Sequence, residues 1–399
     1  MFLNAKVLVP VAATVIGTVF AQSPSLCSQP TATINSQADA SALASCSVVS
    51  GNIVIGPSAA GTISIDGPQQ LNGNLICENA GGLTSLGSTT INAISGSFEL
   101  KNLTLLSTLA MGSLRSVNSI NWEALPALSQ LNFPATVTKA KSVLISNTFL
   151  STLDGINLET VQTLGINNNN RLKTFSTQIA NVTSSLDINS NGNNLDVSFP
   201  NLIRAANMTF RNVSTVSIPS LAIVDGSLGF YGNYVPSIIA PNLTSVGSKA
   251  DGQGSLAFVA NTKLTNISMP LLKTVGGAVQ IANNLALTGI SFPSLSYVGG
   301  AIDFSGNFST PDLPALENVK GGFNLQSTSS IDCSNFDSEH GAGKVIQGVY
   351  VCKTTSDVGG IGSGTGGNSG SKKSAAVTVN YNILTTSLLV LVGLAHNLL

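Results

Sequence analysis

The acidic side chains that could perform chemistry are spread along a repeated segment. Glu99, Asp187 and Asp303 occupy the third position of a four-residue pattern, x-Φ-x-Φ with Φ apolar, that recurs between Asn52 and Leu325. Two carboxylates about 5–9.5 Å apart can hydrolyse a glycosidic bond. If the repeats stack about 4.8 Å apart, these acids lie about 19 and 24 Å from one another, because four and five repeats separate them. This spacing argues against a glycoside hydrolase on this face.

Other catalytic groups are scarce. The sequence has two histidines, His340 and His396, and His396 lies in the apolar tail at the C-terminal end. The rest of the chain therefore offers a Ser or Cys nucleophile no second histidine with which to share catalytic roles. The loop acids Asp154, Asp196 and Asp225 are the alternative catalytic carboxylates, although their surroundings are typical of turns. We therefore predict a protein that is not an enzyme and that needs no cofactor or metal.

The five cysteines predict two disulfides and one free thiol. Cys27 and Cys46 precede the first repeat, Cys333 and Cys352 follow the last, and each pair is 19 residues apart. A disulfide that closes a loop of this size contributes about 3 kcal/mol, so we expect both pairs to seal the ends of the repeat array. Cys77 occupies a core position of its repeat and is expected to be a buried free thiol. Intermolecular pairing and metal binding are the alternatives for Cys77.

Asparagines form two overlapping sets. Seven lie in Asn-x-Ser/Thr sequons and are predicted N-glycosylation sites: Asn102, Asn181, Asn207, Asn212, Asn242, Asn266 and Asn307. A second set follows most repeats by two or three residues, where we expect a ladder of amides that satisfies backbone groups at each corner: Asn79, Asn102, Asn147, Asn168, Asn191, Asn212, Asn233, Asn261, Asn283 and Asn307. Three sequons belong to both sets and are expected to be partly buried and less occupied.

The elements that must position these residues are short strands. The x-Φ-x-Φ segment occurs thirteen times, mostly 20 to 23 residues apart, with one longer step of 28 between Ser227 and Ser255. A repeat this short cannot bury its own apolar face, so the repeats must stack into a solenoid. Apolar residues alternate with a period of two, which favours strands over helices. We predict an all-β parallel β-solenoid of about 13 coils of about 22 residues, with the fourth-position residues, including Trp122 and the phenylalanines, in the core.

Both ends of the chain carry targeting signals. Residues 1–21 combine Lys6, an apolar run and a small residue before Gln22, as a secretory signal peptide does. At the other end, small residues around Asn368, a polar spacer and an apolar tail match a glycosylphosphatidylinositol (GPI) attachment signal. The alternative is a single transmembrane anchor, but the 17-residue tail is short for a bilayer that needs about 20 residues.

These signals divide the chain. We expect a removed signal peptide at 1–21, one solenoid ectodomain at 22–352, a Gly/Ser-rich stalk at 353–368 and a removed propeptide at 369–399, with Asn368 as the attachment residue and Ser369 or Gly370 as alternatives. The remaining chain has 14 basic and 18 acidic residues, a net charge near −4. No basic patch survives, so nucleic-acid binding has no electrostatic basis.

The residues that enter the first repeat carry a family signature. Cys46 to Ile55 reads CSVVSGNIVI and resembles the first strand of receptor L-domains, C-x-V-V-x-G-N-L-x-I. With the repeats, the sequons and the anchor signal, the chain resembles the fungal GPI-anchored cell-wall organisation glycoproteins and their sporulation-specific relatives. The resemblance implies a receptor L-domain-like or leucine-rich-repeat-like solenoid at the plasma membrane and wall, needed for wall integrity. It supplies no catalytic residues, and the paired, shorter L-domains of animal receptors give no ligand-binding mode to transfer.

Three function classes follow, in order of preference. The first is a non-catalytic structural glycoprotein on the outer face of the plasma membrane, in the wall, or both. The second is a binding module or adhesin that uses the outward sheet face or the loop from Gly247 to Gly254. The third is a glycan-active enzyme. The expected partners are the membrane, through a GPI lipid, and wall polysaccharide or wall proteins.

Overall fold

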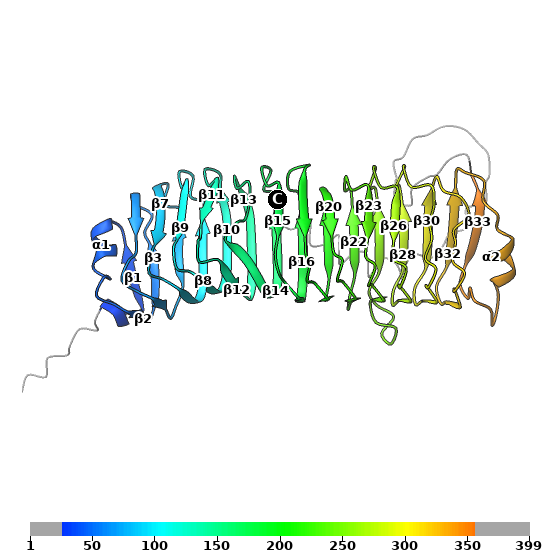
Figure 1. Ribbon diagram of the computed structural model, residues 1–399, viewed down its shortest axis with the longest axis horizontal. Coiled ribbons are helices and arrows are strands. Elements are labelled where there is room, and N and C mark those ends of the chain that lie inside the picture. Colours follow the sequence, from blue (N-terminus) through cyan, green and yellow to red (C-terminus); the bar gives the residue numbers. More distant parts are fainter. Residues whose placement is uncertain (1–25, 356–399) are drawn as a thin grey trace, which may run out of the picture.

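The chain winds into one long rod (Figure 1). The computed structural model describes residues 26–355. They form a parallel β-solenoid of about 14 turns of roughly 22 residues, with almost no helix. The predicted fold class is therefore confirmed. Every strand pairing in the described residues is parallel, as stacking of successive turns requires.

One column of strands runs the length of the rod and contains all thirteen predicted segments. In Figure 1 it begins at β1 and ends at β33. The column comprises β1 (Thr31–Ile34), β3 (Asn52–Ile55), β6 (Leu75–Glu78), β8 (Ala93–Lys101), β10 (Ser116–Leu125), β13 (Ser142–Thr148), β14 (Ile156–Asn167), β16 (Asn181–Asn189), β19 (Met208–Arg211), β22 (Leu228–Tyr231), β25 (Leu256–Val259), β28 (Val279–Ala282), β30 (Ile302–Gly306), β32 (Phe323–Ser327) and β33 (Tyr350–Thr354).

Shorter strands complete the other faces of each turn. Those that precede the main strands belong to the same 24-stranded sheet: β2 (Val48–Val49), β5 (Gln70–Leu71), β12 (Val137–Lys139), β18 (Arg204–Ala205), β21 (Ile223–Val224), β24 (Ser245–Val246), β27 (Thr274–Val275), β29 (Tyr297–Val298) and β31 (Asn318–Val319). Three smaller sheets form the remaining face: β4 (Ala60–Ser64), β7 (Gly82–Ser88), β9 (Thr108–Met111) and β11 (Gln130–Asn132); β15 (Thr174–Ser176), β17 (Leu195–Ser198) and β20 (Val213–Ser217); β23 (Ser237–Ile239) and β26 (Asn266–Ser268).

The core lies where the period-two pattern places it. All the fourth-position residues of the predicted strands are buried. Phe210, Phe230 and Phe258 stand opposite one another in register and stack with ring centroids 5.3 Å apart. Trp122 is fully buried and meets Phe98 edge to face, with centroids 5.5 Å apart. Each such aromatic side chain contributes about 1.5–3 kcal/mol through burial, so this column is packing and not a sugar platform.

The asparagines at the corners form two rows, and the single ladder that the sequence predicted is wrong. One row is buried inside the turn and hydrogen-bonds from coil to coil: Asn169, Asn191, Asn233, Asn261 and Asn284. The other row adopts the left-handed backbone conformation at the preceding corner, with side chains that are exposed or half-exposed: Asn79, Asn102, Asn147, Asn168, Asn212 and Asn283. Asn tolerates this conformation better than most residues, which explains its frequency there.

The terminal turns of the rod are covered by short helices. Helix α1 (Gln37–Ser41) follows β1 and begins with a capping box in which Ser36 and Asp39 exchange hydrogen bonds. Its Ala40 is buried with Leu43 against the first turn. Helix α2 (Ser334–Glu339) precedes β33, and its Phe336 packs on Phe323 with ring centroids 4.9 Å apart. Figure 1 shows α1 and α2 at opposite ends of the rod. The remaining helical segment is the 3-10 turn η1 (Leu26–Ser28).

The one long repeat contains a projecting loop. Between β24 and β25, Ser248 and Gln253 form an antiparallel bridge that closes the loop predicted from Gly247 to Gly254. It projects from one side of the rod in Figure 1. Lys249 of this loop lies over the Tyr297 ring, 4.4 Å from its centroid. Within residues 26–355, no helix has the length and apolar character needed to cross a membrane.

Candidate functional site

The cysteines lie at the positions that end caps require. Cys27 of η1 is bonded to Cys46, with Cα atoms 5.5 Å apart, just before β2. Cys333, at the start of α2, is bonded to Cys352 of β33, with Cα atoms 5.9 Å apart. Cys77 is a free thiol with no exposed surface. Burial raises the pKa of this thiol to about 12, which keeps it protonated and unreactive at neutral pH.

All seven sequon asparagines are exposed or half-exposed. Asn102, Asn207, Asn242, Asn266 and Asn307 are exposed, and Asn181 and Asn212 are half-buried. The expected partial burial of Asn102 and Asn307 is therefore wrong, because these corners belong to the outer side of the turn, whereas Asn212 is half-buried as predicted. The predicted attachment residue Asn368, the signal peptide, the stalk beyond Thr355 and the propeptide lie outside the described residues.

The acids that sequence analysis weighed as catalytic pairs do not meet one another. Asp187 of β16 accepts a hydrogen bond from Asn189 at 2.5 Å, and Asp303 of β30 accepts one from Asn324 at 2.7 Å. Burial raises the pKa of both carboxyl groups, and the amide hydrogen bonds oppose the shift. Each acid has amide partners and no second carboxylate, an arrangement that does not form an acid–base pair.

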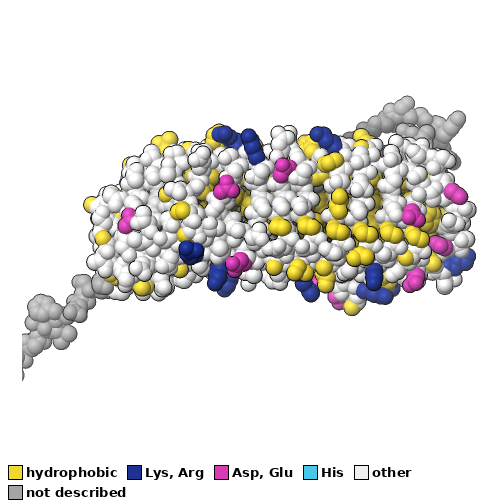
Figure 2. Space-filling model, in the orientation of Figure 1, with side chains coloured by type: hydrophobic (Ala, Val, Ile, Leu, Met, Phe, Trp, Pro, Cys, Tyr) yellow, Lys and Arg dark blue, Asp and Glu magenta, His cyan; other side chains and the backbone are white. Residues whose placement is uncertain are grey.

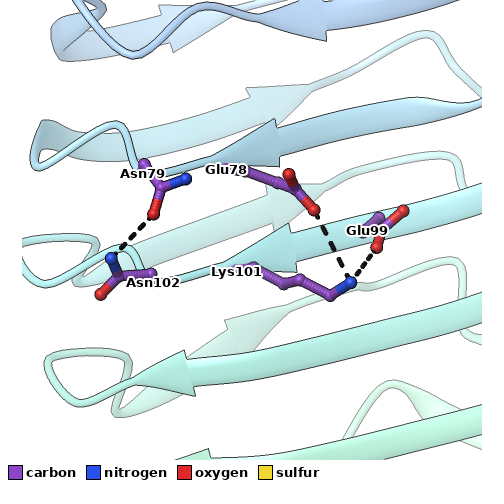
Figure 3. Close-up of polar contacts among 5 residues, drawn as sticks. All are labelled: Glu78, Asn79, Glu99, Lys101 and Asn102. Atoms are coloured by element: carbon purple, nitrogen blue, oxygen red, sulfur yellow. Dashed lines mark hydrogen bonds and ion pairs between the residues drawn. The ribbon is translucent and has the colours of Figure 1, made fainter.

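A cluster of charges that the sequence analysis missed surrounds Lys101 (Figure 3). The Lys101 ammonium contacts Glu99 of its own strand and lies 3.6 Å from Glu78 of the preceding coil. The hydrogen bond to Glu99, together with the charges of Glu99, Glu123 and Glu78, raises the pKa of Lys101. Glu78 and Glu123 follow the fourth position of their strands, so they also face outward, and counting only third-position acids overlooked them.

This cluster brings carboxylates closer together than the predicted separation of four and five coils. Both Glu78 and Glu99 lie within ion-pair distance of the same nitrogen. The Lys101 ammonium therefore occupies the space between the carboxylates in which a glycosidic oxygen would have to bind. The arrangement is an ion-pair network on a surface, which stabilises the fold modestly.

A shallow polar hollow lies one coil further along the rod. It has a volume of about 440 Å³ and is lined by the ends of β10, β13 and β14, through Glu123, Ala124, Ser146, Asn147, Asn168 and Asn170. Ala124 has a φ of 55°, and its counterparts in the flanking coils are Asn102 and Asn147, with φ of 51° and 53°. Because alanine lacks the amide that its neighbours carry, the corner is open at this turn.

The lining of the hollow is rich in free polar groups. Within the described residues, the side chains of Asn147 and Asn170 make no hydrogen bond, and the Glu123 carboxylate has no salt bridge. Ser146 donates to Asn167 at 2.5 Å. No group of His, Cys, Asp and Glu side chains in residues 26–355 is arranged to hold a metal ion. The hollow can therefore offer amide and carboxylate hydrogen bonds to a ligand.

An exposed aromatic side chain lies near these lining residues in the sequence. Phe149 follows Asn147 by two residues and is 42% exposed. The Arg171 guanidinium lies over its ring, 4.2 Å from the centroid, and Arg171 directly follows Asn170. Phe149 and Arg171 are thus close in the sequence to two lining residues, but neither side chain is part of the lining.

Comparisons with known proteins identify the chain's relatives. A sequence model of the family described as "Ecm33: GPI-anchored cell wall organization protein" matches residues 4–44. The chain is 46% identical over 324 residues to "Protein ecm33" of Aspergillus fumigatus, covering 81% of this chain and 79% of that protein. It is 39% identical to "Cell surface GPI-anchored protein" of Arthroderma benhamiae, covering 80% and 81%. No solved structure matches the chain.

A more distant relative extends the family. "Sporulation-specific protein 2" of Saccharomyces cerevisiae is 32% identical over 309 residues, covering 76% of this chain and 60% of that protein. The resemblance drawn from the Cys46–Ile55 signature, the repeats and the end signals is therefore confirmed. The similarity spans most of the solenoid and not only one motif. The chain belongs to the Ecm33 family of GPI-anchored cell wall organization proteins.

Proposed function

We propose that this chain is a non-catalytic glycoprotein, held at the cell surface by a GPI lipid at Asn368, that organises the fungal cell wall and maintains its integrity. It acts on the outer face of the plasma membrane, in the wall, or in both. Its partners are the membrane, through the lipid, and wall polysaccharide or wall proteins. The names of its relatives support the location and the wall role.

The observation that carries this proposal is the surface of the rod. Figure 2 shows charged side chains scattered over a mostly uncharged face, with a row of hydrophobic side chains along the C-terminal half. All seven sequon asparagines are accessible on the rod. A stiff body that can carry glycans along its length, and that has few charges, suits a place among neutral polymers. Its long, parallel ladder gives it the rigidity of a spacer.

The absence of catalysis rests on how the acids are used. Asp187 and Asp303 have amide partners, and Glu78 and Glu99 share the Lys101 ammonium. Purified ectodomain incubated with wall polysaccharides should release no reducing sugar. Release of sugar that disappears in a Glu99→Gln, Glu78→Gln double variant would show that the chain is a glycan-active enzyme.

The wall role is tested by replacing the native gene. We expect a deletion strain to be hypersensitive to wall-binding dyes and to lyse without osmotic support, and the full chain to restore growth. A chain truncated after Asn368 should be secreted into the medium and fail to restore it. Normal wall-stress resistance in the deletion strain would contradict the proposed role.

A binding module is the second candidate, and the polar hollow at Ala124 favours it. Free amides in a hollow that is open to solvent are suited to hold a ligand. A wall organiser and a binding module are compatible, since a spacer must attach to something. The adhesin form of this candidate predicts that cells lacking the protein adhere less to foreign surfaces while keeping an intact wall.

A further inference from the structure

We propose that the hollow at Ala124 is a binding site for a neutral, hydroxyl-rich sugar chain. This inference rests on the proposed function, because it names the kind of wall component that the rod contacts. The hollow is open to solvent and is lined by Glu123, Ser146 and three asparagines. Its volume, about 440 Å³, lies near the lower end of the range of ligand pockets, about 300–1,000 Å³. It can therefore seat a short stretch of a polymer.

The hollow exists because one corner residue is small. Ala124 pairs laterally with Asn147, since Glu123 stands opposite Ser146 and Leu125 opposite Thr148 in the ladder. On the other side, Leu103 donates its backbone N–H to the Ala124 carbonyl, so Asn102 is the neighbour in the preceding coil. A left-handed backbone disfavours alanine by about 1–2 kcal/mol. Unfavourable backbone geometry beside an open, polar surface is a feature of functional sites.

The polar groups of the hollow match vicinal hydroxyls. A carboxamide offers both a donor and an acceptor, and a carboxylate accepts two hydrogen bonds. Asn147 and Asn170 have no partner among the described residues, so they can bind a ligand without first breaking an internal hydrogen bond. Asn168 donates to Asn167 at 3.2 Å and keeps its carbonyl oxygen free. Adjacent hydroxyl groups of a sugar ring can satisfy these amides in pairs.

The charges favour a neutral ligand over an anion. The lining contains one carboxylate, Glu123, and no Lys or Arg. An anionic polymer would therefore meet the Glu123 charge with no cation in the lining to match its own. The hydroxyl groups of a neutral chain can instead hydrogen-bond to the free amides and to the carboxylate.

The glycan of the adjacent sequon is directed away from the hollow. The Asn102 amide nitrogen, which would carry the glycan, donates to the Asn79 carbonyl oxygen at 2.8 Å (Figure 3). Asn79 lies on the side of Asn102 opposite Ala124. A glycan on Asn102 therefore starts toward Asn79, and the hollow stays accessible to a chain from outside the molecule.

The test uses the mature protein released from its anchor and measures binding of neutral gluco- and manno-oligosaccharides of four to eight sugars by calorimetry and saturation-transfer NMR. Ala124→Asn restores the side chain that flanking corners carry, so it should fill the hollow without harming the fold. We expect at least tenfold weaker binding for Ala124→Asn and for the double variant Asn147→Ala, Asn170→Ala. Asn283→Ala, at an equivalent left-handed corner far from the hollow, should bind as the wild type does.

The inference is overturned if folded wild-type protein binds no neutral oligosaccharide, or if Ala124→Asn changes the affinity less than twofold. Tighter binding of a polygalacturonate than of the neutral chains would also overturn it. The wall role is judged separately in cells. If Ala124→Asn restores wall-stress resistance fully to the deletion strain, the proposed function stands and this site is not the means by which it is exerted.

Discussion

The amide nitrogen of Asn233 donates to the carbonyl oxygen of Asn261 at 2.9 Å, and both side chains are buried. The same Asn261 oxygen accepts from the Asn233 backbone N–H at 3.0 Å. Asn261 in turn donates to the Phe230 carbonyl and to Asn284. One side chain thus satisfies polar groups in the coils on both sides of its own and links three consecutive coils.

Asn261→Ala should be among the most destabilising single changes in the rod. It leaves the Asn233 backbone N–H and one of the Asn233 amide N–H groups buried without an acceptor, and it removes a donor from the Phe230 carbonyl. Each buried group left unpaired costs about 1–3 kcal/mol. We expect a loss of about 3 kcal/mol or more in the free energy of unfolding, measured by urea denaturation. Asn147→Ala, at an exposed corner, should cost only about 1–2 kcal/mol, the penalty for alanine in a left-handed backbone. Equal losses in the two variants would show that the buried row does not carry this energy.

Removing a cap disulfide should open one end of the solenoid. Cys46→Ser and Cys352→Ser each remove a cross-link worth about 3 kcal/mol, so secretion and thermal stability should both fall. Non-reducing peptide maps of the wild type should contain Cys27 linked to Cys46 and Cys333 linked to Cys352. A map in which Cys77 is bridged to any of these residues would contradict the assignment.

The buried Cys77 thiol predicts that the difference in free energy of unfolding between the wild type and Cys77→Ala depends on pH. Cys77→Ala should lower the free energy of unfolding by about 1–2 kcal/mol at pH 7 through lost packing. Burial raises the pKa of this thiol to about 12, whereas an unfolded cysteine titrates near about 8.5. Between these values only the unfolded chain loses the proton, so the wild type loses stability as pH rises. The gap between the two proteins should shrink from pH 9 upward, and a gap that stays constant to pH 11 would refute the shift.

The corner sequons should carry glycans like the others. Asn102 and Asn307 are as accessible as Asn266, so we expect similar occupancy at all three when glycopeptides are quantified by mass spectrometry. Asn102→Gln should change the free energy of unfolding by less than about 1 kcal/mol, because its amide partner Asn79 is exposed. Unmodified Asn102 and Asn307 in material with full occupancy at Asn266 would indicate that the corners are shielded.

The C-terminal signal predicts how the protein leaves the cell. Treatment of cells with phospholipase C or with wall glucanase should release the ectodomain, and its peptide map should end at or near Asn368. Mutation of Asn368, Ser369 and Gly370 together to bulky residues should block attachment. An intact peptide spanning Ile383–Leu399 in the mature protein would mean that the tail is retained as an anchor.

The core could be predicted from the sequence because the period-two alternation of apolar residues leaves one solution for the buried face. Strand β1 was missed although Thr31 to Ile34 fits the same pattern, since Ala32 is a weak apolar signal and the cysteines suggested a cap without a strand. The structure adds it in register with β3. Strand β33 was not predicted because Lys353 interrupts the alternation of apolar residues, and none of its residues is fully buried.

The asparagine rows could not be separated by composition, because pairs such as Asn168 and Asn169, or Asn283 and Asn284, stand side by side. Only the backbone decides: at these corners the second residue after the fourth strand position turns into the left-handed region and the third turns inward, whereas Asn307, the third residue after Phe304, is exposed. Counting from the fourth strand position also places Glu78 and Glu123, which directly follow it, on the outer face. The hollow at Ala124 had no sequence signal, since it arises from a side chain that the neighbouring corners have and this one lacks.

The helices at the two ends of the rod affect how these molecules associate when they are densely packed. A bare terminal strand would present unpaired N–H and C=O groups that recruit another chain and seed fibres. With α1 outside β1 and α2 outside β33, we expect such rods to meet only along their flanks, where glycans on the accessible sequons would keep them apart. A dense surface layer of such rods is therefore expected to have a uniform thickness equal to the rod length, about 67 Å at 4.8 Å per turn. The number of turns encoded in the gene then sets the thickness of that layer.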